Sequence, residues 1–400
     1  MKRGMRYIIA VLILSILSGC SSIYTQPEAS QTDIDENVTR EELTPTLEQP
    51  PETVEKNTEI DILFAGDIML HMPQINSAKV SFGYDFTLPF QYVKPYVEKA
   101  DFAIANIETS FSDKDKPFSG FPLFNSPVEI LDAIKLTGFD LLSTANNHVL
   151  DQGKDGIIKM IDEIDKRELL YVGTSKDIYT PYRIVDVEGI KIGIMTYAFY
   201  LNGLNSRLTD DERGRMINVF EEKRAIKDIE NAKADGAEFI ILFLHWGNEY
   251  QTTASDYQRQ TAKTLAENGA DIIIGSHPHV IQDSETIDVG NKKVNVFYSL
   301  GNFYSNQRKE TMGNSLTEDG AMLNLHIVKD NLSNEVKLER VTPIPTWVYK
   351  RKTNEKNEYF ILPVKDALDG NLDIDLPEGV LTRLKKSYED TSTQLNLYIN

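Results

Sequence analysis

The sequence predicts an α/β fold in which two β-sheets pack against each other and helices cover their outer faces. Three patterns carry this prediction: short, largely apolar runs typical of buried strands, amphipathic segments of helical length between them, and hairpin-like pairs of alternating segments. Alternating strands and helices favour parallel strands joined by crossovers, whereas the hairpins add antiparallel strands. Together the patterns indicate an α/β sandwich, and the sequence shows no internal repeat.

The elements are predicted in chain order from residue 59 onward. Five apolar runs are expected as buried strands: Ile60–Ala65, Phe102–Ile107, Phe139–Ala145, Phe239–Leu244 and Asp271–Ile274. Four amphipathic segments are expected as helices: Val128–Thr137, Lys154–Arg167, Phe220–Lys233 and Asp256–Asn268. Gly138 and Gly269 lie where two of these helices should end. Hairpin turns are predicted at Val187–Ile190 and Val289–Lys292.

Residues 1–19 have the pattern of a secretory signal peptide. A basic start precedes the apolar run Tyr7–Ser18, which as a helix would reach only about 18 Å, too short for a hydrocarbon layer of about 30 Å. The run ends in Leu17–Cys20, Leu-Ser-Gly-Cys, which resembles the lipobox of bacterial lipoproteins. That resemblance implies cleavage before Cys20, lipid attachment to its sulfur, and an extracytoplasmic protein anchored to the bacterial cell membrane. The alternative is an ordinary secretory signal followed by an unrelated cysteine.

The rest of the chain divides into three predicted parts. Residues 20–58 are expected as the acylated cysteine and a disordered acidic tether, because residues 21–58 hold nine carboxylates, two basic residues and few large apolar groups. Residues 59–345 are expected as the folded domain. Residues 346–400 are more polar and form a C-terminal extension whose role the sequence leaves open, with a short helix predicted around Pro377–Tyr388.

Charge and cysteine content exclude several kinds of protein. The chain has 42 Lys+Arg against 61 Asp+Glu, a formal net charge of −19, which argues against a nucleic-acid partner. The single cysteine, Cys20, excludes an intrachain disulfide and a thiolate metal cluster. The same negative charge would repel an anionic polymer at long range, so binding one would require local positive charge such as that of metal ions.

Chemically active side chains cluster directly after the predicted strands, where open α/β sheets place their ligand sites. Taken singly, each of these residues could instead have a structural role, such as capping a helix or stabilising a turn. The proline in His277-Pro278-His279 favours an extended His277, and residues two apart in an extended chain point the same way. Imidazole, carboxylate and amide oxygen suit Mn, Fe or Zn. The candidates are Asp67, His71, Glu108, Asn147, His148, Asp151, His245, His277 and His279.

Six short motifs follow one another in order within Ile60–Asn306. They are Gly-Asp at 66–67, Asn-x-Glu at 106–108, Asn-Asn-His at 146–148, His-Trp-Gly at 245–247, Ser-His-Pro-His at 276–279 and Tyr-Ser-Leu-Gly-Asn-Phe at 298–303. This order resembles the CapA family of poly-γ-glutamate capsule-synthesis proteins, which are related to calcineurin-like metallophosphoesterases. The resemblance implies a four-layer αββα sandwich of the metallophosphoesterase type with a centre of two divalent metal ions.

The resemblance also implies roles for the candidate residues. Six would be metal ligands: Asp67 and His279 for one ion, Asn147, His245 and His277 for the other, and Glu108 as the bridge between them. His148 would act beside the ions as a general acid or transition-state donor, with Asp151 as its orienting partner. Two metal ions held in this way support hydrolysis of a phosphoester or an amide.

Three positions depart from the family pattern. Typical metallophosphoesterases begin with Asp-x-His, but Met69 occupies the third position here, so one ligand is missing and His71 is the candidate replacement. Many relatives carry arginine where this chain has Met72 and Asn125. A guanidinium would bind phosphate or carboxylate through two hydrogen bonds, so its absence argues against an anionic substrate or against catalysis.

Two functional hypotheses follow. The first is a surface-anchored, hydrolase-like protein that acts in the synthesis or processing of poly-γ-glutamate or a related envelope polymer. The second is a non-catalytic accessory subunit of a membrane-bound polymer synthase or exporter. A solute-binding lipoprotein is disfavoured because the polar residues follow metal-ligand order. His326, within Met322–Val328, is expected to be an ordinary strand residue.

Overall fold

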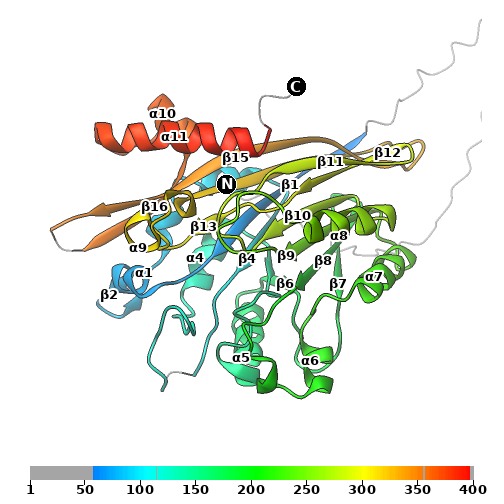
Figure 1. Cartoon of the computed structure of the whole chain (residues 1–400), viewed down its shortest axis with the longest axis horizontal. Coiled ribbons are helices and arrows are strands. Elements are labelled where there is room, and N and C mark those ends of the chain that lie inside the picture. The colour runs from blue at the N-terminus through cyan, green and yellow to red at the C-terminus, as the bar shows by residue number, and fades with distance from the viewer. Residues whose placement is uncertain (1–56, 114, 355, 397–400) are drawn as a thin grey trace, which may run out of the picture. The chain divides into compact units, whose positions relative to one another are not determined.

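The computed structural model describes residues 57–113, 115–354 and 356–396 (Figure 1). The predicted signal peptide, Cys20 and nearly all of the predicted tether lie outside these ranges. None of the helices in the described ranges combines the length and the apolar character needed to cross a bilayer.

Within the described residues, the first sheet has eight strands in the order β16-β15-β14-β1-β4-β5-β6, with β13 beside β1. Their bounds are β1 Thr58–Ile68, β4 Phe102–Ile107, β5 Leu141–Ser143, β6 Leu170–Val172, β13 Asn302–Tyr304, β14 Asp319–Lys329, β15 Val336–Lys352 and β16 Asn357–Pro363. Strands β1, β4, β5 and β6 are parallel neighbours, so their carboxyl ends meet at one edge. Strands β14, β15 and β16 continue the sheet in antiparallel fashion.

The second sheet, among the described residues, has six strands in the order β11-β12-β10-β9-β8-β7. Their bounds are β7 Tyr182–Val187, β8 Ile190–Ala198, β9 Phe239–His245, β10 Ile272–Ser276, β11 Ser284–Val289 and β12 Lys292–Phe297. The four inner strands are parallel. Both edges are hairpins, β7–β8 and β11–β12, which confirms the two turns predicted from the sequence.

Helices and short elements fill the connections between the strands. The helices are α1 Met72–Ser77, α2 Thr87–Phe90, α3 Lys94–Lys99, α4 Ile130–Thr137, α5 Gly153–Asp165, α6 Asp210–Met216, α7 Glu222–Ala234, α8 Asp256–Glu267, α9 Lys309–Met312, α10 Val364–Asp369 and α11 Glu378–Gln394. Single 3₁₀ turns lie at Asn205–Arg207 and Ser315–Glu318, and β2 Lys79–Val80 pairs with β3 Gly83–Tyr84. The four helices predicted from amphipathic segments are all present, with ends that differ by no more than two residues.

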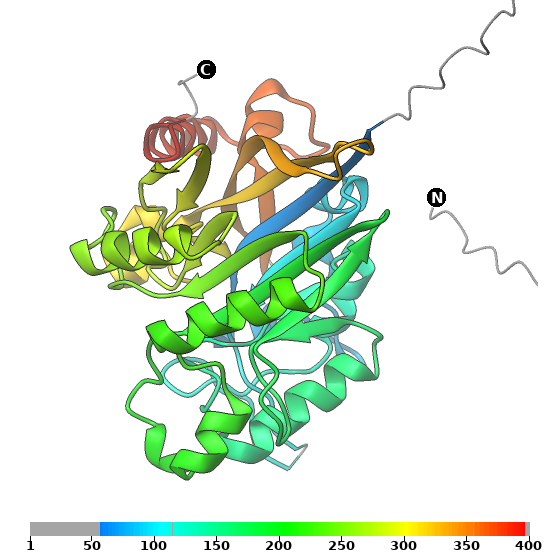
Figure 2. The same cartoon turned by 90° about the vertical axis from the view of Figure 1, so that its right-hand side faces the viewer.

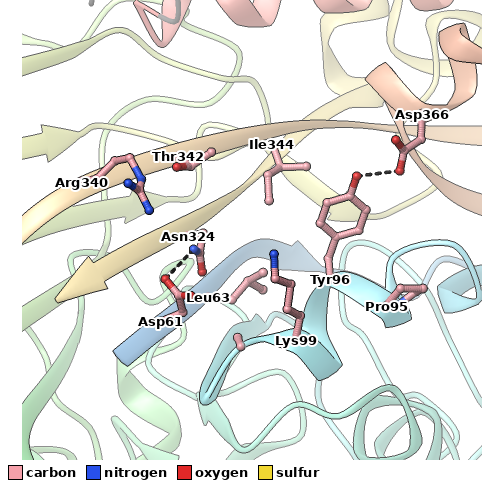
Figure 3. A pocket seen from close by; sticks show the side chains of 11 residues that line it. Asp61, Leu63, Pro95, Tyr96, Lys99, Asn324, Arg340, Thr342, Ile344 and Asp366 are labelled. Atoms are coloured by element: carbon pink, nitrogen blue, oxygen red, sulfur yellow. Dashed lines mark hydrogen bonds between the residues drawn. The ribbon is translucent and has the colours of Figure 1, made fainter. Parts of the chain in front are cut away.

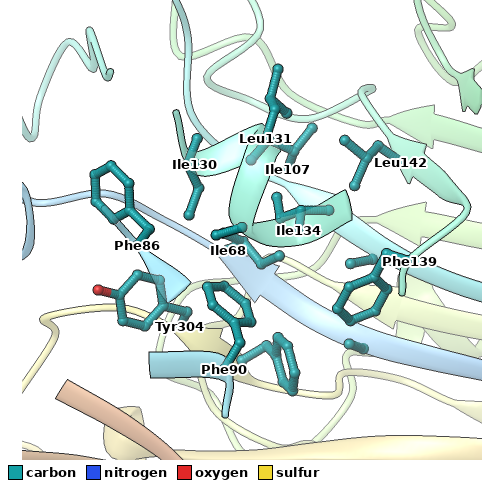
Figure 4. Packing of buried hydrophobic residues seen from close by; sticks show 14 of the residues in the cluster. Ile68, Phe86, Phe90, Ile107, Ile130, Leu131, Ile134, Phe139, Leu142 and Tyr304 are labelled. Carbon is teal, nitrogen blue, oxygen red and sulfur yellow. The ribbon is translucent and has the colours of Figure 1, made fainter. Parts of the chain in front are cut away.

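Alternation of side chains along the strands explains how the layers pack. On β1, Ile62 and Phe64 belong to the cluster between the two sheets, where the Phe64 and Phe243 rings meet edge to face at 5.6 Å. The intervening Leu63 belongs to a second cluster on the outer face of the first sheet, which α4 covers with Ile134 and its neighbours (Figure 4). Helices α7 and α8 cover the outer face of the second sheet (Figure 2). The predicted four-layer αββα sandwich is confirmed.

The chain after residue 345 is continuous with the first sheet. Strand β15 passes through residue 345 without interruption, and β16 pairs along it. Helices α10 and α11 cover the face of these strands that carries Trp347 and Phe360. In addition, the Tyr96 hydroxyl of α3 donates to Asp366 Oδ2 of α10 at 2.6 Å, inside a pocket of about 530 Å³ on the outer face of the first sheet (Figure 3). Residues 346–396 therefore share a core with the domain.

Three elements differ clearly in length from the sequence prediction. Strand β1 has eleven residues, although the apolar run Ile60–Ala65 predicted six. Strand β5 has three residues, although the apolar run predicted seven, because the chain leaves the sheet after Ser143 and forms a loop that carries candidate site residues. Helix α11 extends to Gln394, beyond the predicted end at Tyr388. Gly138 and Gly269 follow α4 and α8 with φ of +113° and +107°, so the predicted helix ends are confirmed.

The packing of α11 predicts a stability effect in the C-terminal segment. Leu384 is fully buried in the cluster around Trp347, so Leu384→Ala should lower the free energy of unfolding by about 2–5 kcal/mol. Chemical denaturation of the purified protein measures this loss. Lys385→Ala, at the next and exposed position, is the matched control and should change stability by less than about 0.5 kcal/mol. Equal stability of Leu384→Ala and wild type would show that α11 is not part of the cooperative core.

Candidate metal centre

The first part of the site lies at the carboxyl ends of β1 and β4. Asp67, the penultimate residue of β1, and Glu108, which directly follows β4, are both fully buried. Asn106 Nδ2 donates to Asp67 Oδ1 at 2.7 Å and fixes that carboxylate. Gly66 lets β1 approach the loop before β13, since a Cβ there would lie 2.2 Å from the Gly301 carbonyl oxygen. The parallel pairing of two strands therefore places two carboxylates side by side.

The second part of the site is built around His245, the last residue of β9. Its Nε2 atom lies 2.9 Å from Asn147 Oδ1 and 3.1 Å from His277 Nδ1. Its Nδ1 atom lies 2.9 Å from Ser276 Oγ. When Nδ1 donates its proton to this hydroxyl, Nε2 keeps its lone pair for the groups that converge on it. Asn147 is held in turn by its amide, which donates to Asn202 Oδ1 at 3.2 Å.

The loop after β10 connects the two parts. The expectation that His277 is extended is wrong: His277 has φ of +97° and His279 has φ of +56°. In this left-handed conformation the His277 N–H donates to Asp67 Oδ2 at 3.2 Å. The two imidazole rings are 5.9 Å apart, and His279 Nδ1 lies 3.4 Å from the same Asp67 oxygen. The turn therefore brings both imidazole rings to the site beside Asp67.

Glu108 lies between these two histidine groups. Its Oε1 atom is 3.5 Å from His245 Nε2 and 3.7 Å from His279 Nε2. Both of its oxygens are buried, and neither has a hydrogen-bond partner among the described residues. Burial, followed by the nearby Asp67 carboxylate, raises the pKa of Glu108 well above its usual value. A buried carboxylate is costly without a partner, and a cation would supply one.

His245 and His277 have the protonation state that metal binding requires. Burial lowers the pKa of His245 far below its usual value, and the neighbouring His277 and His279 lower it further. Burial likewise lowers the pKa of His277 to about 3. Neutral imidazole, which offers a lone pair, is the form that binds divalent metals.

The side chains therefore form two ligand groups that share one carboxylate. One group is Glu108, His245 and His277, and the other is Asp67, Glu108 and His279; within each, the ligand atoms lie within 4.8 Å of one another. Asn147 joins the first group through its contact with His245. All six residues expected as ligands are thus brought together, and this donor set fits a pair of divalent cations.

His148 and Asp151 form a pair beside these groups. His148 Nδ1 lies 2.8 Å from Asp151 Oδ2, and the same oxygen accepts the Phe124 N–H at 2.7 Å. The His148 ring is buried and packs edge-on against the Phe124 ring at 4.7 Å. The sequence placed these two residues near the centre, and the structure places them in direct contact.

Comparison with known proteins agrees with this geometry. A family model described as "Bacterial capsule synthesis protein PGA_cap" matches residues 61–307. The chain belongs to this family. The resemblance to CapA proteins drawn from the motifs is therefore confirmed.

Two relatives carry names related to capsule synthesis. The capsule biosynthesis protein CapA of Bacillus anthracis is 30% identical over 291 residues, which cover 69% of this chain and 66% of that protein, just under two thirds. The PGA biosynthesis protein CapA of Bacillus subtilis (strain 168) is 28% identical over 333 residues, which cover 80% of each chain.

Two solved structures show a more distant similarity. The calcineurin-like phosphoesterase YfkN from Bacillus subtilis is 16% identical with a TM-score of 0.45, and the match covers 84% of this chain and 98% of that one. The NAD nucleotidase of Haemophilus influenzae is 15% identical with a TM-score of 0.45, covering 84% of this chain and 60% of that one.

The residues that depart from the family pattern lie close to the centre. Met69 is buried and contributes no ligand atom to either group. Met72 lines a pocket of about 340 Å³ together with His71, Phe121 and Met312, and none of the described residues that line it is a lysine or an arginine. Asn125 is turned to its own loop, where Nδ2 donates to the Pro117 carbonyl oxygen at 2.8 Å. These positions therefore provide no positive charge for an anionic substrate.

His71 and His326, the remaining histidines, lie outside the ligand groups of the described residues. His71 Nδ1 accepts the Asn306 N–H at 3.3 Å, and burial lowers the pKa of His71 to about 4. His326 lies within β14, as predicted, and its Nδ1 atom is 3.1 Å from Asp61 Oδ1.

Sequence reasoning missed three residues that shape the centre. Asn106 and Ser276 orient Asp67 and His245; both belong to the Asn-x-Glu and Ser-His-Pro-His motifs, which assigned no role to them. Glu249 lies four residues beyond the end of β9 and received no role, yet its carboxylate lies within 4.8 Å of the ligand atoms of His277 and His279. The only sequence signal for Glu249 is its position two residues after the His-Trp-Gly motif.

The contact between Asn106 and Asp67 predicts a measurable contribution to stability. Asn106→Ala removes the donor from a buried carboxylate oxygen, so it should lower the free energy of unfolding by about 1–3 kcal/mol. Denaturation is measured in the presence of a chelator, so that metal binding does not enter. Asn205→Ala, at an exposed position, is the control. If both variants are as stable as wild type, the orienting role of Asn106 is wrong.

Proposed function

We propose that this protein is a membrane-anchored lipoprotein that acts in poly-γ-glutamate synthesis or processing through a dinuclear metal centre with hydrolase-like chemistry. The observation that carries the proposal is the buried Glu108 carboxylate, which lies between two histidine groups and has no hydrogen-bond partner in the described part of the chain. The choice of polymer is supported by the family and by the names of the two Bacillus relatives.

In this proposal the metal ligands have the roles that the family resemblance implied. They divide into Asp67 and His279 for one ion, Asn147, His245 and His277 for the other, and Glu108 for both. The donors are nitrogen and oxygen only, which suits Mn, Fe or Zn. When bound, such a pair of cations polarises a substrate oxygen and lowers the pKa of a water.

The surrounding residues orient and support this machinery. Asn106 and Ser276 fix the directions of Asp67 and His245. The Asp151 carboxylate accepts a hydrogen bond from the Nδ1–H of His148. Nε2 is therefore the atom of that ring that gives or takes a proton. The Phe124 ring packs against His148 and shields it from water.

The second candidate function is a non-catalytic accessory subunit of a membrane-bound polymer synthase or exporter. The observation in its favour is the composition of the site. Met69 belongs to neither ligand group, and the described residues that line the two pockets containing His71 or His277 include no lysine or arginine. Such a subunit would keep the fold and the metal but not turn over substrate.

Metal analysis and a hydrolysis assay test the proposal together. The wild-type protein should bind two equivalents of Mn, Fe or Zn and hydrolyse a generic aryl phosphodiester. Glu108→Ala should lose metal and at least about 100-fold of the activity, because it removes the carboxylate shared by both ligand groups.

Glu310→Ala, an exposed carboxylate on α9, is the matched control and should behave like wild type. A wild-type protein that binds no metal would refute the proposed centre. Two bound metals without turnover would favour the accessory subunit over the hydrolase.

The lipid anchor has its own test, since Cys20 lies outside the described residues. Cys20→Ala removes the thiol that would carry the lipid, so the protein should move from the membrane fraction to the soluble extracytoplasmic fraction. Cell fractionation followed by immunoblotting measures this change, with Ser21→Ala as the control. Membrane retention of Cys20→Ala equal to that of wild type would contradict lipid anchoring.

A further inference from the structure

The proposed centre has an incomplete ligand set on the side of Asp67 and His279. Asp67, Glu108 and His279 would hold this ion among the described residues, and Met69 lies at the position where the family resemblance implies a histidine ligand. A divalent transition metal with three protein ligands has room for at least one more. The question is which side chain of this protein fills that place.

His71, the candidate from the sequence, is poorly placed for this role. Its Nδ1 atom accepts the Asn306 N–H, and its ring packs edge-on against Phe124 at 5.4 Å. Its own N–H donates to Gln74 Oε1 at 2.9 Å, which ties its backbone to the start of α1. His71 belongs to none of the groups of histidines and carboxylates that converge within 4.8 Å among the described residues.

Glu249, unlike His71, belongs to a group of convergent candidate ligands. A third convergent group joins its carboxylate to His277 and His279, with ligand atoms within 4.8 Å of one another. This group shares its histidines with the two groups that contain the buried Asp67 and Glu108 carboxylates. In contrast to those carboxylates, Glu249 is exposed and lines a pocket of about 600 Å³ together with Tyr200 and His277.

Backbone hydrogen bonds hold Glu249 near the histidines. The Trp246 N–H donates to the Ser276 carbonyl oxygen at 3.1 Å, and the Tyr250 N–H donates to the Pro278 carbonyl oxygen at 2.7 Å. These two bonds join the loop of Glu249 to the loop of His277 and His279 on both sides. The ring of Tyr250, the residue after Glu249, lies 6.2 Å from that of His279.

We propose that Glu249 is an additional ligand of the metal centre, on the side of the open pocket, and that it compensates for the ligand missing at Met69. This inference rests on the proposed dinuclear centre. It adds a third carboxylate to the donor set, so the bound centre carries one less positive charge than Asp67 and Glu108 alone would leave. A substrate that enters the pocket beside Tyr200 then meets a carboxylate ligand at the metal rather than an exposed cation.

Metal titration of the purified full-length protein and its variants tests the inference. Mn²⁺ is the probe, and binding is followed by calorimetry and by metal analysis after dialysis. Wild type should bind two equivalents, whereas Glu249→Gln, which keeps the shape but loses the charge, should bind one of them at least about 10-fold more weakly. His71→Ala should bind both as wild type does.

The control is Glu310→Gln, and thermal unfolding in chelator should show all variants equally folded. If wild type and Glu249→Gln bind two equivalents with the same affinities, the role of Glu249 is wrong while the dinuclear centre stands. Loss of one equivalent in His71→Ala but not in Glu249→Gln would assign the ligand to His71 and overturn the inference. A wild-type protein without bound Mn²⁺ would overturn the proposed centre itself.

Discussion

The burial of the Glu108 carboxylate between two histidine groups is the constraint on which the rest of the site depends. A charged group in that position requires an opposite charge nearby, and the described side chains around it offer neutral imidazoles and another carboxylate. The same strand ends that bury Glu108 also bring Asp67 beside it and direct His245 and His279 to the same oxygen. The parallel pairing of β1 with β4 and of β9 with β10 is therefore as important to the chemistry as the ligands themselves.

Much of this architecture could be predicted from the sequence, because its signals are local. The apolar runs that form β4 and β9, the amphipathic segments that form α7 and α8, and the glycines that end α4 and α8 each express a short-range preference. The six ligands expected from the motifs follow strand ends, and strand ends in a parallel sheet meet at one edge. What the sequence could not supply was the path of the loops. The His277 turn is left-handed because its N–H bonds Asp67, a residue 210 positions away in the chain. Glu249 went unassigned for the same reason, since its neighbours come from another loop.

The chemistry around the centre also bears on the nature of its ligand. The chain as a whole is acidic, and no lysine or arginine of the described residues lines the pockets that contain His71 and His277. Under the proposed function, a polyanion would therefore depend on the proposed metal ions for favourable electrostatics near these pockets. Such a site would suit a short stretch or an end of a polymer better than an extended run of charges.

The left-handed backbone at His277 and His279 has an energetic cost that the rest of the fold must offset. Glycine is the residue that adopts positive φ without strain, yet glycine cannot offer a ligand atom. At both positions the chain accepts an imidazole in a conformation that costs about 1 kcal/mol or more. The surrounding sheets must supply that energy, which they do through their large shared core. The stability of the whole fold therefore bears the cost of placing two ligand side chains at positions whose backbone favours glycine.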